Sequence, residues 1–541
     1  MRAARLVMVL AAVLAIWGVW GYDLWAPDEP YFGEGAREMV VDGHWAVPHV
    51  NGQVTTDKPP LFFWLIALFS LPVGSVTSLT ARVPSVLASL GTLWLTMRLG
   101  RRWAGERAGA LAGLVLATTY LFWDKSRTAQ IDALLCFLVL AALSAFESFR
   151  AGDARGQRAG LLFWLAGSLA VLAKGPVGIL LPLGIAVATL AFDRNLASWK
   201  RFAPWTGPAV FLALIGGWIA LATVGGSGEY SVWGAFEKHV LSRAVHGMHH
   251  KQPPWYYLTV LPVQLLPWSA LVPGALLLAW RRRAESADRF ALVHALFVCI
   301  FFSIWTEKRD LYVLPAYPAF ALIVSRLLVA VEPAGELNAR GAGPRAAAVP
   351  IAITAVLMIL LGCALPFVAR RAQVDLSIGA AALAVALVAG GVTALILQRR
   401  GSIARPATAL ALTMAAAYLA TATWIFPVLD PMKSARSLAL RLRAAADETR
   451  AVSGEIPALD VGNLVQGLAF YSGGVYTRVV DDAAPVVQLL SGDRPAAAVV
   501  SRNAYDALPM SLRADLDIVG ASKFSRFEAL IVRNRKALAA R

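Results

Sequence analysis

The chain has 541 residues, of which 58% are apolar and 16% charged, and its mean hydropathy is +0.60. A soluble protein would be about half apolar and a quarter charged, so the composition excludes a soluble, a disordered and a disulfide-rich secreted protein. The net charge of +16 fits cytoplasmic loops rich in Lys and Arg better than nucleic-acid binding. The sequence therefore predicts an integral membrane protein.

Apolar runs follow one another along most of the chain. A spanning helix needs roughly 20 mostly apolar residues. Runs near that length lie at 5–21, 82–99, 107–123, 130–149, 159–173, 175–192, 205–224, 256–280, 290–305, 312–330, 347–369, 377–397 and 405–426. The three cysteines lie inside such runs without metal or redox spacing. Because motif residues follow the first run directly, we interpret it as an uncleaved anchor and not as a signal peptide.

A further run, residues 61–76, is ambiguous because it is short and contains Pro72 and Gly74. If it does not span, the N-terminus and the basic segments share the cytoplasmic side; these segments are 98–102, 150–158, 194–201, 281–283 and 399–400. If it does span, the later basic segments all move outside, against the positive-inside rule. We therefore predict an interfacial helix here and thirteen transmembrane helices in all.

The composition changes abruptly after residue 430. Residues 431–541 mix polar and apolar residues and contain no spanning run. Segments 497–501 and 527–532 are typical of short buried strands, and 437–450 of an amphipathic helix. We predict a transmembrane domain at 1–430, with a first outer loop at 22–81 that carries interfacial helices. A small α/β domain at 431–541 follows, on the extracytoplasmic side.

Carboxylates stand directly against apolar helices on the outer side. Asp28 and Glu29 follow the first span, and Asp132 begins the fourth. Ionisable groups at this depth are costly, so they indicate function. The alternative is that they only cap helices: Asp28 and Glu29 a helix around 33–42, and Asp132 its own helix.

Cations gather in the same outer loops, at Lys58, Lys174, Arg243 and Lys308. Lys174 either snorkels to the interface or binds an anion. Together the four cations can hold a phosphate or pyrophosphate through charge-assisted hydrogen bonds, and Asp28 can orient an attacking group or accept its proton. The boundary position indicates a donor whose tail stays in the bilayer, which favours a lipid-linked phosphate.

The outer loop at 225–255 also carries histidines, among them His249 and His250. Clustered histidines can bind a transition metal, and Asp57 can complete such a site. The spacing differs from that of a standard zinc module, and an exposed histidine run is the alternative.

Short motifs recur in order along these loops. The first loop reads Asp28-Glu-Pro-Tyr-Phe-Gly-Glu34-Gly-Ala-Arg37-Glu38-Met39 and then Asp57-Lys58-Pro59-Pro60, and Asp132 and the segments 173–175, 254–257 and 308–315 follow. In combination they resemble the aminoarabinose (4-amino-4-deoxy-L-arabinose) lipid A transferases, bacterial relatives of the protein O-mannosyltransferases with a GT-C membrane fold.

The resemblance implies a multi-pass glycosyltransferase of the bacterial inner membrane. Such an enzyme moves a sugar from an undecaprenyl-phosphate carrier to lipid A, or to a related envelope glycolipid, at the periplasmic face. It implies Asp28 as the principal catalytic carboxylate, with Asp132 and Glu29 near the reaction centre. The implied donor-phosphate ligands are Lys58, Lys174, Arg243, Lys308 and Tyr312. The implied ligands of zinc or another divalent metal are Asp57, His249 and His250, and no organic cofactor is expected.

Two departures limit what the resemblance carries over. The family usually reads Asp-Glu-Thr-Arg-Tyr where this chain reads Asp28-Glu-Pro-Tyr31-Phe32, and Lys-Leu-Pro-Thr-Tyr where it reads Lys308-Arg-Asp-Leu-Tyr312. Both changes touch the expected sugar or acceptor pocket, so the sugar and the acceptor stay open. The alternatives are a protein O-mannosyltransferase and a lipid or sugar transporter. Transporters hold ionisable residues near the bilayer midplane, whereas here they crowd one face.

Overall fold

The structure is a computed structural model. It describes residues 2–56, 58–152, 155–225, 251–331, 345–371, 375–400, 403–449, 451, 454–524 and 527–535. The chain divides into two compact units. The helical unit comprises residues 1–19, 56–62 and 83–425, and the α/β unit comprises 20–55, 63–82 and 426–541. Most of the predicted first outer loop, residues 22–81, thus belongs to the same unit as the C-terminal residues.

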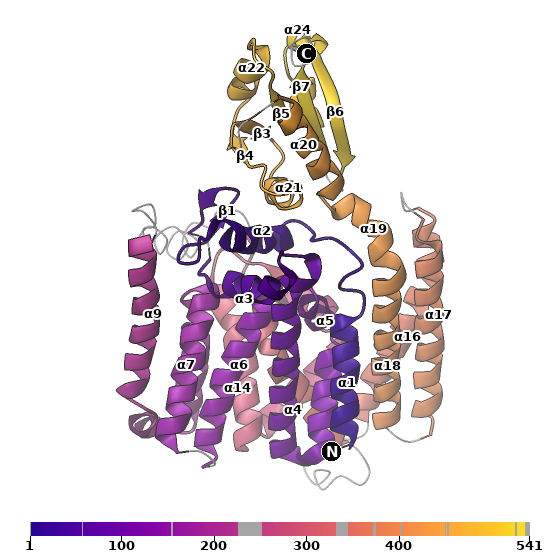
Figure 1. Ribbon diagram of the computed structural model, residues 1–541. Coiled ribbons are helices and arrows are strands. Elements are labelled where there is room, and N and C mark those ends of the chain that lie inside the picture. Colours follow the sequence, from indigo (N-terminus) through magenta and orange to yellow (C-terminus); the bar gives the residue numbers. More distant parts are fainter. Residues whose placement is uncertain are drawn as a thin grey trace. The chain divides into compact units, whose positions relative to one another are not determined.

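The helical unit is a bundle of apolar helices (Figure 1). Its helices are α1 (Arg2–Ile16), α4 (Ser78–Ala117), α5 (Tyr120–Ser126), α6 (Ile131–Arg150), α7 (Gly156–Lys174), α8 (Val177–Phe192), α9 (Thr206–Gly225), α12 (Tyr256–Gln264), α13 (Val272–Arg281), α14 (Ser286–Ile304), α15 (Tyr317–Ala330), α16 (Arg345–Ala369), α17 (Ser377–Gln398) and α18 (Ala404–Ala420). Three short 3-10 helices, η2 (Leu196–Arg201), η4 (Ser269–Leu271) and η5 (Asp310–Ala316), and a π-helical turn (Thr421–Ile425) complete it.

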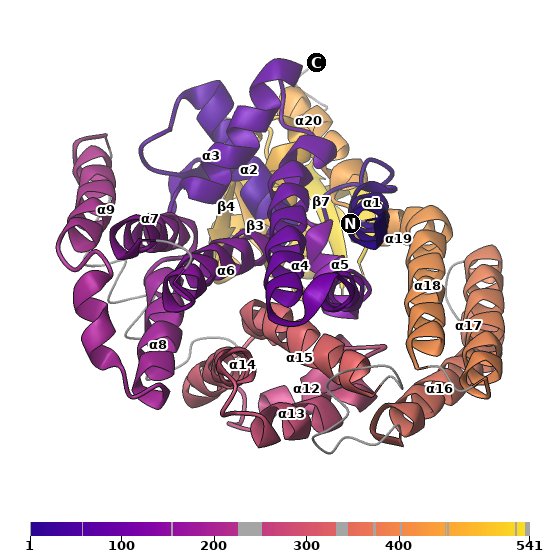
Figure 2. The ribbon, with the colours of Figure 1, turned by 90° about the horizontal axis from the view of Figure 1, so that it is seen from below.

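Within the described residues, eight helices are long and apolar enough to cross a membrane. Three shorter apolar helices accompany them, at Leu61–Val73, Val177–Phe192 and Ser269–Arg281. Seen along the helices, α16, α17 and α18 pack together at one side of the unit and α6 to α9 at another, with α12 to α15 between them (Figure 2). The protein is therefore a multi-pass membrane protein.

The runs 82–99 and 107–123 are separated as predicted. They lie on the two helices that make up α4, whose backbone leaves helical geometry at Ala104 and Gly105 with φ of −151° and 83°, and the second run continues into α5. One predicted run is divided in the structure. The run 256–280 is broken into α12, η4 and α13 around Pro267. Proline lacks the N–H that would continue the helix, so the break follows from the sequence.

Buried ion pairs gather at the end of α6 and α7 that holds the basic segments. Arg150 pairs with Glu147 at 2.6 Å and with Asp193 at 2.9 Å, and Arg326 pairs with Asp288 at 2.6 Å. Burying a charge is tolerable only when it is paired. This end of the bundle therefore uses its charges in intramolecular contacts.

The α/β unit contains a five-stranded sheet with helices on both faces. Its helices are α2 (Asp28–Asp42), α3 (Leu61–Ser70), α19 (Phe426–Lys433), α20 (Arg436–Thr449), α21 (Leu464–Ser472), α22 (Ala484–Ser491), α23 (Arg502–Asp506) and α24 (Met510–Ala514), with a 3-10 helix η1 (Leu71–Val73). Its strands are β1 (His49–Val50), β2 (Gln53–Val54), β3 (Ile456–Leu459), β4 (Thr477–Val480), β5 (Ala497–Ser501), β6 (Leu516–Lys523) and β7 (Glu528–Asn534).

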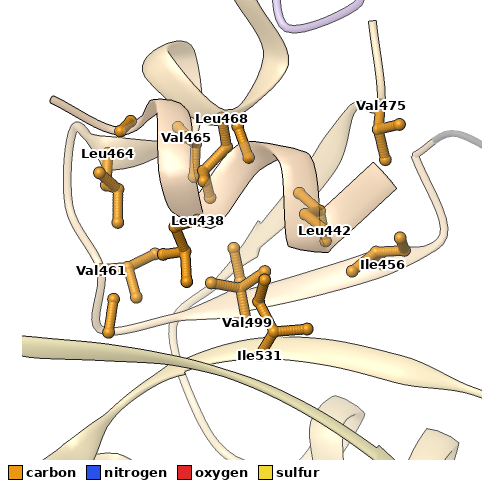
Figure 3. Close-up of a cluster of buried hydrophobic side chains, with 14 of the residues drawn as sticks. Leu438, Leu442, Ile456, Val461, Leu464, Val465, Leu468, Val475, Val499 and Ile531 are labelled. Carbon is orange, nitrogen blue, oxygen red and sulfur yellow. The ribbon is translucent and has the colours of Figure 1, made fainter. Parts of the chain in front are cut away.

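The order in the large sheet is β4-β3-β5-β7-β6. β3 is parallel to β4 and β5, whereas β7 is antiparallel to β5 and β6. One apolar cluster under α20 and α21 includes Leu438, Leu468 and Val499 (Figure 3). A second, under α22 and α24, includes Val486 and Leu512. The predicted strands and the amphipathic helix are confirmed as β5, β7 and α20.

Glycines let α2 approach its neighbours in the α/β unit. A Cβ atom on Gly33 would lie 2.5 Å from Leu24, and one on Gly35 would lie 2.5 Å from Phe63. Glycine in a helix interior costs up to about 1 kcal/mol relative to alanine, so its use here reflects close packing. This packing fixes the helix that begins with Asp28.

Candidate active site

A buried ion pair fixes the first turn of α2. The Arg82 guanidinium donates from Nε to Glu29 Oε1 at 2.7 Å and from Nη2 to Glu29 Oε2 at 2.8 Å. It also donates to the carbonyl oxygens of Tyr22 and Asp23, at 3.0 and 2.7 Å, and lies over the Tyr22 ring at 3.8 Å. The Arg82 side chain is 0% exposed. Both oxygens of Glu29 are thus bound by Arg82, which belongs to the same α/β unit.

Asp28 is the first residue of α2, immediately before Glu29. Its side chain is partly buried, whereas Glu29 is fully buried. The N-terminus of a helix stabilises a negative charge, and Asp28 stands at this position. Of the two adjacent acids, Glu29 is thus held by Arg82, whereas Asp28 is the less buried one.

The segment before α2 is also bonded to the C-terminal helices of the same unit. Asp430 Oδ1 accepts from the backbone N–H of Asp23 at 2.9 Å and from Trp25 Nε1 at 2.7 Å. The Tyr471 hydroxyl accepts from the backbone N–H of Leu24 at 2.6 Å. Burial raises the pKa of Tyr471, so the hydroxyl stays neutral. Residues far apart in the sequence thus fix the backbone on which Asp28 stands.

In the helical unit, three predicted site residues lie together. Asp132 is the second residue of α6, and Lys174 is the last residue of α7. The Lys174 ammonium pairs with Asp132 Oδ1 and lies 4.5 Å from the ring centroid of Tyr312, on η5. An anion at a helix N-terminus and a cation at a helix C-terminus are both favoured by the helix dipoles. The arrangement is a cation held beside a carboxylate and an aromatic face.

The segment that leads to Asp132 is fixed by buried hydrogen bonds. Arg127 donates from Nη2 to the carbonyl oxygen of Trp17 at 2.7 Å, and Trp123 donates to that of Leu14 at 3.1 Å. The Trp123 ring stacks on Tyr418 with centroids 4.1 Å apart. Ser85 Oγ donates to the carbonyl oxygen of Gln130 at 3.1 Å. Asp132 therefore projects from a rigid segment.

The other predicted cations have different surroundings. Lys308 is 3% exposed, and its ammonium donates to the carbonyl oxygens of Gln252, at 2.9 Å, and Trp305. It therefore joins the two segments around 252 and 305 of the helical unit. Lys58 lies just before α3 and is partly buried.

Part of the predicted site lies outside the described residues, namely Arg243, Asp57, His249 and His250. In the part of the chain that the structure describes, no group of three or more His, Cys, Asp or Glu residues is placed to hold a metal. The predicted metal site therefore stays a prediction.

Sequence reasoning missed Arg82. It stands at the head of an apolar run on the side predicted to be outside, where the positive-inside rule disfavours arginine. A lone arginine in that position is a usable signal for a buried acidic partner. The sequence does not show which acid is the partner, because Glu29 lies 53 residues before Arg82.

The phosphate role predicted for Lys174 leads us to expect that its replacement by alanine weakens binding of a lipid-linked phosphate roughly ten- to a hundredfold, the worth of one charge-assisted hydrogen bond. It also leaves buried Asp132 without its cation and costs about 3–5 kcal/mol of stability. The double variant Lys174→Met/Asp132→Asn removes both charges, so it should recover stability but not binding. Calorimetry of the purified variants measures both effects, and unchanged affinity in the stable double variant would contradict the phosphate role.

Comparison with known proteins gives two kinds of similarity in sequence. Residues 57–220 match the family described as dolichyl-phosphate-mannose-protein mannosyltransferase. An undecaprenyl phosphate-α-4-amino-4-deoxy-L-arabinose arabinosyl transferase of Pseudomonas aeruginosa is 31% identical over 315 residues, which cover 57% of this chain and 56% of that protein. A protein of the same name from Aeromonas salmonicida is 30% identical over 323 residues, or 58% of each chain. The chain thus spans little more than half the length of these relatives.

Solved structures show the same fold. The crystal structure of ArnT from Cupriavidus metallidurans bound to undecaprenyl phosphate has a TM-score of 0.77 at 23% identity and covers 98% of this chain and 97% of that one. The archaeal oligosaccharyltransferase AglB from Archaeoglobus fulgidus has a TM-score of 0.50 at 10% identity, covering 92% and 69%. The resemblance predicted from the motifs is therefore confirmed: this chain has the GT-C membrane fold of ArnT and is similar in sequence to the aminoarabinose transferases and the protein mannosyltransferases.

Proposed function

We propose that this protein is a glycosyltransferase that moves a sugar from an undecaprenyl-phosphate carrier to lipid A or a related envelope glycolipid. The observation that carries the proposal is the cluster of Asp132, Lys174 and Tyr312 in a chain with the ArnT fold. A cation at the end of two apolar helices suits the phosphate of a lipid whose tail stays in the bilayer. The relatives named as arabinosyl transferases support the same reaction class.

The proposed reaction is a displacement at the anomeric carbon of the donor sugar. Asp28 orients the attacking oxygen of the acceptor or accepts its proton. The bond from the anomeric carbon to the donor phosphate breaks, and undecaprenyl phosphate leaves with the negative charge. Lys174 stabilises that charge, assisted by Lys58, Arg243, Lys308 and Tyr312.

The proposed topology has thirteen spans and an active site on the periplasmic side of the bacterial inner membrane. The two parts of α4 on either side of its kink, α1, α6 to α9, α12 with α13, and α14 to α18 supply these spans. The short α3 is then an interfacial helix, and the C-terminal α/β domain is periplasmic. In support, Arg150 and the basic residues 155–158 stand at the opposite ends of α6 and α7 from Asp132 and Lys174.

A metal at Asp57, His249 and His250 is a separate proposal. Elemental analysis of the purified full-length protein tests it, and a preparation that transfers sugar without zinc or another divalent ion would refute it. No step of the proposed reaction depends on this metal.

Mass spectrometry of lipid A and of periplasmic proteins, from cells with and without the gene, tests the function. A sugar on lipid A that depends on the gene is the expected result. The match to the mannosyltransferase description favours protein as a second acceptor class. If a protein is glycosylated and lipid A is unchanged, the acceptor is protein and not lipid A. Transfer by the purified protein from the lipid-linked donor distinguishes both from transport.

A further inference from the structure

Two buried carboxyl groups lie one helical turn apart on α2. Glu34 is 0% exposed and Glu38 is 1% exposed, and their i and i+4 positions on α2 place the two side chains side by side on one face of the helix. Arg37 donates to both oxygens of Glu34 at 2.8 Å. Glu38 Oε1 accepts from the backbone N–H of Gly52 at 3.0 Å. The Arg37 guanidinium thus binds Glu34. Glu38 instead has the carboxyl group of Glu34 and the backbone amide of Gly52 as neighbours.

The charges of this cluster do not balance when both acids are ionised. The titratable groups that interact with Glu38 are Glu34 and Arg37 on its own helix and Tyr476 on the segment before β4. Two carboxylates and one guanidinium would leave a net negative charge away from water, which is costly. One proton shared by the two acids removes this charge. Burial, reinforced by Glu34, correspondingly raises the pKa of Glu38 to about 8.

The cluster joins three segments of the α/β unit. Arg37 Nη2 donates to the Tyr476 hydroxyl at 3.0 Å, and this hydroxyl donates to Asp42 Oδ2 at 3.1 Å. In the turn between β1 and β2, Asn51 and Gly52 have φ of 60° and 72°. The Asn51 amide exchanges hydrogen bonds of 2.7 and 3.1 Å with the backbone of Thr477. Through Gly52, Glu38 holds this turn against α2.

The same helix carries Asp28 at its other end. Glu38 lies ten positions after Asp28, about 15 Å along the helix axis at 1.5 Å per residue. The two side chains therefore do not touch, and an effect of Glu38 on Asp28 passes through the position of the helix.

We propose that Glu34 and Glu38 share one proton, and that Glu38 is a positioning residue that holds α2, and with it Asp28, against the turn at 51–52 and the segment 474–477. Loss of the shared proton leaves two buried negative charges and loosens these contacts. The part that concerns Asp28 rests on the proposed function, whereas the shared proton does not.

The direction of the pH dependence follows from the raised pKa. The value of about 8 in the folded protein exceeds the ordinary value for glutamate of about 4.3. The stabilisation is therefore complete below the ordinary value and is lost as the pH rises through the folded value. We expect the contacts of α2 to weaken between about pH 6 and pH 9.

Hydrogen exchange of the full-length protein in nanodiscs, read by mass spectrometry from pH 5 to 9.5 and corrected for the intrinsic pH dependence of exchange, tests the shared proton. In the wild-type protein, protection of 28–42 and 49–54 should fall with a midpoint near the folded pKa. Glu38→Gln keeps a neutral side chain of the same shape, so its protection should not fall in this range. Asp447→Asn removes an exposed carboxylate of α20 that lies outside this cluster and should behave as the wild type does.

A Glu38→Gln protein whose protection falls as the wild type's does would overturn the proposal. If Glu38→Gln does not fold, Glu34→Gln replaces it. Removing either acid leaves one carboxylate beside Arg37, so no shared proton is needed and protection from exchange should not fall with pH. Glu38→Ala, which cannot hold Gly52, should be unprotected at every pH.

Transferase activity gives the second readout. The wild-type rate should fall at alkaline pH with the same midpoint, and Glu38→Gln should keep its rate. If the transfer rates of the wild type and of Glu38→Gln both fall at alkaline pH with the same midpoint, the positioning role is overturned. Exchange that behaves as expected in a protein without transferase activity would refute only the proposed function.

Discussion

The Arg82→Ala variant is expected to lose about 3–5 kcal/mol of stability, because it leaves the buried carboxylate of Glu29 without its cation. It also leaves the carbonyl oxygens of Tyr22 and Asp23 without their donor. Thermal unfolding of the purified protein in detergent measures the loss. Since Glu29 adjoins Asp28, transferase activity should fall as well, even at temperatures at which the variant stays folded.

Two variants separate the charge of Arg82 from its shape. Arg82→Lys keeps a positive charge but cannot form the two parallel bonds to Glu29, so it should recover only part of the stability. Arg82→Met with Glu29→Gln removes both charges and should be more stable than Arg82→Ala. A stability of Arg82→Ala within about 0.5 kcal/mol of the wild type, as for ordinary surface changes, would contradict the role given to this ion pair.

The Asp28→Asn variant is expected to lower the rate of sugar transfer roughly 100- to 10,000-fold, the usual contribution of a positioned acid or base. The amide has nearly the same shape as the carboxylate but cannot accept a proton. Asp28 is the first helical residue after the N-cap Pro27, so the loss of its charge should cost only about 0.3–1 kcal/mol of interaction with the helix dipole, and the fold should be retained. The measurement is the appearance of sugar on lipid A by mass spectrometry, at matched expression.

Asp447→Asn is the control for Asp28→Asn, since it removes an exposed carboxylate of the same α/β unit. It should transfer sugar at nearly the wild-type rate. Intact modification by Asp28→Asn would remove the catalytic assignment and leave Asp28 as a residue that only stabilises the start of α2.

Most helices of the bundle could be predicted from apolar runs, because a helix that crosses a bilayer must satisfy its own backbone hydrogen bonds and present apolar side chains. The runs 130–149, 159–173 and 377–397 correspond closely to α6, α7 and α17. The break at Ala104 and Gly105 falls between the predicted runs 82–99 and 107–123 and is therefore confirmed. The division of the run 256–280 into α12, η4 and α13 was not predicted, because hydropathy records how long a run is and not where the backbone breaks inside it.

The candidate site was predicted as a set of residue types, and its pairings were not. Asp132 and Lys174 were expected to act separately, as a carboxylate near the reaction and as a phosphate ligand. In the structure they form an ion pair beside Tyr312. Which acid meets which base depends on how α6 packs on α7, and sequence spacing does not give that packing.

The sequence by itself determined that this is a multi-pass membrane protein, and its motifs indicated the ArnT-like fold. Composition and order along one chain carry these properties, because the bilayer selects apolar helices of fixed length. Only the tertiary structure decided that Glu29 is bound by Arg82 and that Glu34 and Glu38 share a buried cluster with Arg37 and Tyr476. A charge is stabilised by the groups that surround it in space, and those groups come from segments up to hundreds of residues apart.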